Sequence, residues 1–344
     1  MKNIKAIGFW VALLTIWGCN ESVKKNTDYI VIKGKTMGST YEIAYKGKEN
    51  LKEKIEFMMG YYSYLVSTYD SQSIISKFNK NEILNSEDSI SYLKSKDIFN
   101  ELDSLSLKIY NISNKAFNPS IADLINYWGF GERKKNPDLV DSTLIKQLKN
   151  QVYGFKVEFI GTKPSKNDAL QKLNYNGIAS GQLVDILAKM LENDYQINDY
   201  YINITGELKV KGKNEANEFW KIKIEKPLLN AEKPVAFCEL YLNNLAMATS
   251  GNYRQYFYYK GKRLGHSIDP RTGFPSMNEM LSASIICKSA AEADALATSC
   301  MIAGLEKSIE ILKKNPEYSG IFIYEKDQKL NYWKSNNLEI KMID

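Results

Sequence analysis

Residues 282–301, SASIICKSAAEADALATSCM, combine a strand pattern with a helix pattern in one short stretch. The segment from Ser282 to Cys287 is short and mostly apolar, which predicts a strand. Ser289 with Glu292 three positions later forms a capping box, and this predicts a long helix that runs to about Lys313. Because this helix is apolar nearly all round, we expect it to be buried.

Working outward from this stretch, strand signals dominate the second half of the chain and helix signals the first half. Helical spacing covers residues 50–66, 93–112, 121–128 and 183–191. Strands are predicted at 29–34, 41–45, 155–160, 200–204, 220–224 and 237–241, with a terminal hairpin at 320–324 and 330–333. Without a regular strand–helix alternation, we expect an α+β domain with a mostly antiparallel or mixed sheet packed with helices, not a doubly wound fold.

The N-terminus has the features of a bacterial export signal. Residues 1–18 begin with two lysines, continue with an apolar core, and end at Gly18 before Cys19. The segment is too short to span a membrane stably. The stretch up to Cys19 resembles a lipobox, which implies lipidation of that cysteine; the alternative is an ordinary secretory signal with a chance cysteine.

These features predict three segments: a lipoprotein signal peptide at 1–18, a polar tether at 19–29, and one large domain at 30–344. The implied location is the bacterial cell envelope, lipid-anchored to a membrane and facing the periplasm.

Composition argues against a nucleic-acid-binding protein and limits the chemistry that cysteine and histidine side chains can supply. The net charge of +6 is spread over many lysines without a dense basic block, so we expect no nucleic-acid partner. Cys238, Cys287 and Cys300 lie in apolar stretches and are expected to be buried free thiols. His266 is the single histidine of the chain, so any imidazole chemistry must use it.

Asp294 and Thr298 lie four positions apart on the last long helix, so their side chains share one face. A carboxylate and a hydroxyl so placed can bind one hard cation, and Mg²⁺ needs few protein oxygens. An ordinary polar pair is the alternative, but a carboxylate on such an apolar helix needs a partner.

Residues 265–273 form a turn that carries His266 and Asp269. A histidine near neutrality can accept the proton of an attacking hydroxyl, and Asp269 can orient it or help hold the substrate. The alternative is a surface hairpin end with a histidine on it.

Two glycine-containing loops can approach a ligand closely. Residues 36–40 connect two predicted strands, and residues 176–181 precede a helix N-terminus, where a pyrophosphate is favoured. Each is alternatively an ordinary turn. A phosphate-binding loop is excluded, because Tyr29 stands where its first glycine is required.

Taken together and in order, these segments resemble the ApbE family of FAD:protein FMN transferases. The matching stretches span about residues 36–305 and are 37–40, 67–70 with Ser73 and 78–79, 116–119 leading to 128–131, 177–181 with 184–185, 206–207 before 211–213, 248–251 with 253–254, 266–275, and 294–298.

The resemblance implies a set of site residues. The cation ligands would be Asp294, Thr298 and the carbonyl of Gly177. For the base that activates the incoming hydroxyl, our own candidate is His266. The residues implied at the FAD site are Met37, Tyr69, Ala116, Phe117, Asn118, Asn174, Ser180, His266 and Ile268.

The implied reaction is the attack of a serine or threonine hydroxyl on the FMN phosphorus of FAD, with AMP as leaving group. FAD is the substrate, Mg²⁺ the cofactor, and the partner a flavin-acceptor domain of a redox protein. With water as acceptor, the same site would hydrolyse FAD.

The chain departs from the family pattern at four positions. The family usually has Asp in place of Asn118 and Asn174, Lys or Gln in place of Ser180, and Gly in place of Thr205. We expect these changes to weaken FAD contacts or to alter the charge balance at the metal.

Two other functions compete with this one. A lipoprotein that binds or hydrolyses FAD without protein transfer would share the same site. A penicillin-binding type of serine hydrolase is the more distant alternative, since Ser91 with Lys94, Ser250 with Asn252, and 271–273 occur in its motif order. The last two motifs lie too close together for that fold.

Overall fold

The computed structural model describes residues 28–82, 89–131, 140–152, 154–160, 163–166, 168–228, 234–252, 256–259 and 262–343. The proposed signal peptide, Cys19 and nearly all of the tether lie outside these residues, so lipidation and the segment boundaries stay predictions. Within the described ranges, no helix has both the length and the apolar character needed to cross a bilayer.

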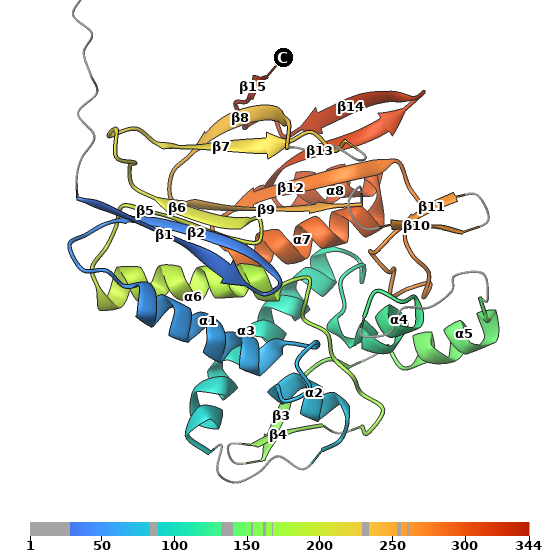
Figure 1. The fold of residues 1–344 in the computed structure, drawn as a ribbon. Helices are drawn as coiled ribbons and strands as arrows, with labels where there is room; N and C mark the ends of the chain where they lie inside the picture. The colour runs from blue at the N-terminus through green and yellow to red at the C-terminus, as the bar shows by residue number, and fades with distance from the viewer. Residues whose placement is uncertain are drawn as a thin grey trace, which may run out of the picture.

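An eight-stranded sheet forms the centre of the fold, and each neighbouring pair of strands is antiparallel (Figure 1). This confirms the expected α+β class. The strands in spatial order are β1 (Tyr29–Thr36), β2 (Ser39–Lys46), β5 (Tyr200–Ile204), β6 (Glu207–Lys211), β9 (Leu245–Gly251), β12 (Met280–Cys287), β13 (Ser319–Lys326) and β14 (Lys329–Lys334).

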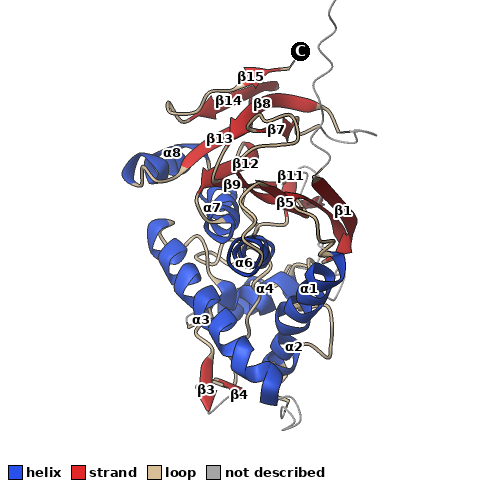
Figure 2. Ribbon diagram, turned by 90° about the vertical axis from the view of Figure 1, so that its left-hand side faces the viewer, coloured by secondary structure: helices blue, strands red, loops and turns tan. Residues whose placement is uncertain are grey.

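A three-stranded sheet lies over one face of the central sheet, opposite the main group of helices (Figure 2). Its order is β15 (Lys341–Met342), β8 (Ala236–Leu242), β7 (Trp220–Glu225). Alternating apolar side chains of β7, such as Ile222 and Ile224, pack with Val210 and Ile321 of the central sheet. The period-two pattern therefore builds one of the two main cores.

Helices cover the other face and form the larger core with it (Figure 2). They are α1 (Lys52–Val66), α2 (Ile74–Asn79), α3 (Ser89–Ile112), α6 (Ala179–Asp194), α7 (Ala290–Ala303) and α8 (Leu305–Lys314). A smaller group comprises η2 (Pro119–Ile121), α4 (Ala122–Tyr127) and α5 (Ser142–Asn150), and two hairpins are β3 (Glu158–Ile160) with β4 (Lys163–Ser165) and β10 (Tyr256–Tyr259) with β11 (Lys262–Gly265). As expected, Cys238, Cys287 and Cys300 are buried free thiols.

The predicted helix from Ser289 to Lys313 is two helices. Gly304 has φ +81°, which ends α7 and lets α8 start in a new direction. The Ser289 cap is present, since its side chain accepts the Glu292 backbone N–H at 3.2 Å. The Glu292 side chain instead pairs with Lys108 at 2.7 Å and accepts the Tyr318 hydroxyl, so only half of the capping box forms.

The N-terminal ends of α6 and α7 are in close contact. A Cβ atom on Gly181 would lie 2.3 Å from the carbonyl oxygen of Ala290, so only glycine allows this approach. Asp185 of α6 accepts hydrogen bonds from the Ser289 hydroxyl at 2.7 Å and the Ala291 N–H at 3.1 Å. Lys209 of β6 balances the charge of Asp185 at 2.7 Å. This contact fixes where α7 begins relative to α6 and the sheet.

We predict that Gly181→Ala destabilises the protein by roughly 1–3 kcal/mol, because the added methyl group overpacks the helix contact. The matched control is Gly60→Ala in α1, where an added Cβ meets no atom within 4 Å. That change is expected to stabilise the protein by up to about 1 kcal/mol. Denaturant unfolding measures both, and equal effects of the two substitutions would contradict the packing argument.

A second prediction concerns Asp103, whose carboxylate is buried in α3. It accepts the Tyr175 hydroxyl at 2.6 Å and the Val157 N–H at 2.8 Å, yet burial raises its pKa to about 6. A raised carboxyl pKa means that the stabilisation is complete below the ordinary value and is lost as pH rises through the folded value.

We therefore expect the stability advantage of the wild type over Asp103→Asn to shrink by about 2 kcal/mol between about pH 4.5 and pH 7.5. Urea unfolding of both proteins at both pH values measures this difference in unfolding free energy. Other titrating groups affect the wild type and the variant equally, so their contributions cancel. An advantage that stays constant or grows with pH would contradict the assignment.

Candidate active site

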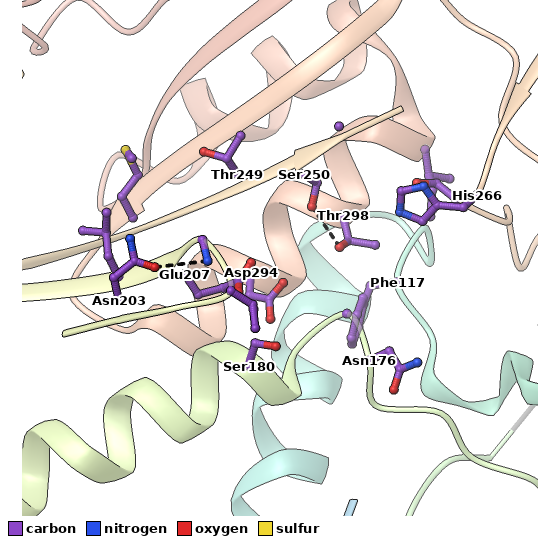
Figure 3. Close-up of a pocket in the computed structure, with 18 of the residues that line it drawn as sticks. Phe117, Asn176, Ser180, Asn203, Glu207, Thr249, Ser250, His266, Asp294 and Thr298 are labelled. Carbon is purple, nitrogen blue, oxygen red and sulfur yellow. Dashed lines mark hydrogen bonds between the residues drawn. The ribbon is translucent and has the colours of Figure 1, made fainter. Parts of the chain in front are cut away.

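A cavity of about 800 Å³ opens between the central sheet, the start of α6, and α7 (Figure 3). Its walls come from segments far apart in the sequence: the loop before η2, the loop before α6, the β5–β6 turn, β9, and the segment after β11. The size is in the range of small-molecule and cofactor sites.

Asp294 and Thr298 both line this cavity from one face of α7, as their spacing predicts. Asp294 is only 5% exposed, and one of its carboxylate oxygens accepts the backbone N–H of Gly181 at 3.2 Å. The hydroxyls of Thr298 and Ser250 lie 3.2 Å apart. The close contact of α6 with α7 therefore holds the carboxylate at the cavity wall.

Gly177 lies against Thr298 at the loop before α6. A Cβ atom there would lie 3.4 Å from the Thr298 hydroxyl oxygen and 3.3 Å from the Phe117 ring, so the backbone passes close to α7. The structure thus brings Gly177, Asp294 and Thr298 together around one space.

This donor set fits a hard divalent cation. Carboxylate, hydroxyl and carbonyl oxygens are the ligands that Mg²⁺ prefers, and it leaves places for water and phosphate oxygens. In the part of the chain that the structure describes, no three His, Cys, Asp or Glu side chains cluster as a softer transition metal would require. The chemistry of these residues therefore suits magnesium.

Glu207 is a cavity residue that the sequence analysis did not assign to the site. It is the first residue of β6 and lies close to Asp294 (Figure 3). Burial raises the pKa of Asp294 well above its ordinary value, and the nearby charge of Glu207 raises it further. Burial also raises the pKa of Glu207, and a hydrogen bond from Thr205 partly offsets this. The sequence did contain a signal for Glu207, because residues 206–207 are one of the stretches that match the ApbE family.

Seven of the residues predicted for FAD besides His266 line the cavity: Tyr69, Ala116, Phe117, Asn118, Asn174, Ser180 and Ile268. Met37 is not among the lining residues. It has φ +48° in the β1–β2 turn and packs against the main core, so its contact with FAD stays a prediction.

His266 lines the cavity next to Ser267 and Ile268, with its ring edge-on to Phe130 at a centroid distance of 6.2 Å. The following loop is fixed by the Trp128 indole N–H, which donates to the Gly273 carbonyl at 2.8 Å. The Asp269 carboxylate pairs with Arg271 at 2.8 Å and is not among the lining residues. Its role in orienting His266 stays a prediction.

Asn118 and Asn174 use their side-chain oxygens locally. Asn118 accepts the Ser120 N–H at 2.9 Å and caps η2, and Asn174 accepts the Asn176 N–H at 2.9 Å. A carboxylate could make the same bonds, so the neutral amides preserve both turns. Compared with the Asp residues usual in the family, Asn118 and Asn174 leave the cavity wall with less negative charge.

Comparison with known proteins finds relatives that share most of the chain. The chain is 32% identical over 308 residues to an FAD:protein FMN transferase of Haemophilus influenzae, which covers 85% of this chain and 86% of that protein. It is 28% identical over 333 residues to the FAD:protein FMN transferase of Escherichia coli K12, and this match covers 92% of this chain and 91% of that protein.

Solved structures show the same fold. The flavin transferase ApbE of Vibrio cholerae aligns with a TM-score of 0.72 at 26% identity, over 90% of this chain and 97% of that one. The apo form of the Pseudomonas stutzeri flavinyl transferase ApbE aligns with a TM-score of 0.75 at 26% identity, over 90% and 95%. The ApbE family profile matches residues 37–322, and the chain therefore belongs to the ApbE family.

Proposed function

We propose that this protein is an FAD:protein FMN transferase that uses Mg²⁺ and modifies a serine or threonine hydroxyl of a flavin-acceptor domain of a redox protein. The observation that carries the proposal is the meeting of Asp294, Thr298, Gly177 and the chain's single histidine at one cavity. Relatives that share most of the chain carry the same activity in their names.

In the proposed reaction, the acceptor oxygen forms a bond to the FMN phosphorus, the bond to the bridging oxygen breaks, and AMP leaves. A bound magnesium ion would neutralise the pyrophosphate charge, which is the main requirement of phosphoryl transfer. Asp294, Thr298 and the Gly177 carbonyl would hold that ion. His266 would take the proton of the incoming hydroxyl.

The remaining residues position the substrate. Phe117 offers an aromatic face at the cavity wall, and Asn118 and Asn174 bring it amide groups. The Ser276 N–H donates to the Ser267 carbonyl at 2.8 Å, and this bond would steady the backbone next to His266 while the acceptor hydroxyl approaches. Such positioning supplies much of the rate of a group transfer.

We further propose that the protein acts in the bacterial cell envelope, facing the periplasm, through a lipid on Cys19. The export signal at residues 1–18 supports this location. Labelling with a radioactive fatty acid, in the wild type and in Cys19→Ser, tests the anchor.

A lipoprotein that binds or hydrolyses FAD without protein transfer is the alternative that shares this cavity. The two are separated by incubating the protein with FAD, Mg²⁺ and an acceptor domain, then measuring acceptor mass. We expect a covalent FMN adduct. Unmodified acceptor with intact FAD would favour binding alone, and FMN plus AMP without adduct would favour hydrolysis. The serine-hydrolase alternative is not retained, because the family match covers residues 37–322.

We predict that Asp294→Ala abolishes Mg²⁺-dependent transfer while the protein stays folded, since the substitution removes a carboxylate that is buried at an energetic cost. Transfer assays over a range of Mg²⁺ concentrations measure the effect, with circular dichroism as the folding control. Full activity in this variant would rule out the cation site.

His266→Ala is expected to lower the transfer rate about 10²–10⁴-fold, the usual contribution of a general base. FAD affinity, measured by fluorescence quenching, should change much less. Equal losses in rate and affinity would point instead to a role in holding the substrate.

A further inference from the structure

The sheet side of the cavity presents two carboxylates, Glu207 at the start of β6 and Glu225 at the end of β7. Of these two, Glu207 lies close enough to Asp294 for the two charges to interact (Figure 3). On the helix side, Asp294 has one oxygen bound to Gly181, and its other oxygen accepts no hydrogen bond from the described residues. A carboxylate buried this deeply must be either protonated or paired with a positive charge, and a cation at the cavity wall would supply that charge.

Glu207 is held by an unusual turn. Thr205 has φ +58°, in the left-handed region that a β-branched residue rarely adopts. The Gly206 N–H donates to the Asn203 side chain at 3.2 Å, and the Thr205 N–H donates to the Thr40 carbonyl at 3.1 Å. The Thr205 hydroxyl donates a hydrogen bond to the Glu207 carboxylate.

Glycine adopts this backbone conformation without strain, but it has no hydroxyl to donate. Backbone strain that persists at a cavity wall is a reason to look for a function. Here the backbone of Thr205 is strained, and its side chain makes one contact that glycine cannot make. That contact is the hydrogen bond to the Glu207 carboxylate.

We propose that Glu207 supplies a second carboxylate to the cation site formed by Asp294, Thr298 and Gly177, and that Thr205 positions it there. This inference rests on the proposed function. Glu207 faces the cation from the sheet, Asp294 and Thr298 face it from α7, and Gly177 from the loop before α6. A bound cation thus ties three separate elements together and relieves the repulsion between the two carboxylates.

The experiment measures Mg²⁺ affinity, using MgCl₂ alone, by calorimetry and by the rise in melting temperature with added metal. The variants are Glu207→Gln, Glu207→Asp and Thr205→Gly. Gln328→Gly is the matched control, because Gln328 also has φ +59° in a hairpin but does not line the cavity.

Glu207→Gln is expected to weaken Mg²⁺ binding about 10–100-fold, as loss of supporting groups at metal sites does. Glu207→Asp should retain part of the affinity. Thr205→Gly should raise the melting temperature of the metal-free protein while it weakens Mg²⁺ binding. Gln328→Gly should raise the melting temperature and leave Mg²⁺ binding unchanged.

Wild-type Mg²⁺ affinity in Glu207→Gln would overturn the role of Glu207. Wild-type affinity in Thr205→Gly would overturn the role of Thr205. Asp294→Asn is measured alongside: if it loses Mg²⁺ while Glu207→Gln does not, only this inference fails. If Asp294→Asn also binds normally, the proposed cation site itself fails.

Discussion

The contact between the N-terminal ends of α6 and α7 determines the rest of the site. Gly181 lets the two helices approach until backbone meets backbone, and each helix then donates an N–H to a carboxylate of the other. The carboxylate of Asp185 in α6 accepts a hydrogen bond from the Ala291 N–H, and the carboxylate of Asp294 in α7 accepts one from the Gly181 N–H. This reciprocal pairing places Asp294 at the cavity wall and gives Gly177, just before α6, its position beside Thr298.

The two carboxylates of this contact have different electrostatic surroundings. Asp185 is balanced by Lys209, whereas Asp294 has Glu207 as its charged neighbour and burial raises its pKa. Both carboxylates take part in the helix contact, and Asp294 is in addition the one that we propose as a cation ligand. Thr205, with its left-handed backbone, contacts Glu207 through its hydroxyl, and we propose that it positions that carboxylate for the cation.

Local patterns predicted much of this arrangement. Period-two alternation located β1, β5 and β7, and helical spacing placed Asp294 and Thr298 on one face. The break at Gly304 escaped prediction because a single glycine inside a helical pattern is compatible with a continuous helix. The sequence analysis did not assign Glu207 to the site, because its proximity to Asp294 depends on the order of the strands in the sheet, which local patterns do not determine. For Asp269, the neighbouring Arg271 satisfies the carboxylate locally, which the motif alone does not reveal.

The central claim is that a divalent cation binds between α7 and the loop before α6. Anomalous diffraction from crystals soaked with Mn²⁺, a substitute for Mg²⁺ with similar oxygen preference, tests it most directly. We expect one strong peak within bonding distance of the Asp294 carboxylate, the Thr298 hydroxyl and the Gly177 carbonyl. A cavity without a peak, or a peak bound only by other residues, would contradict the account.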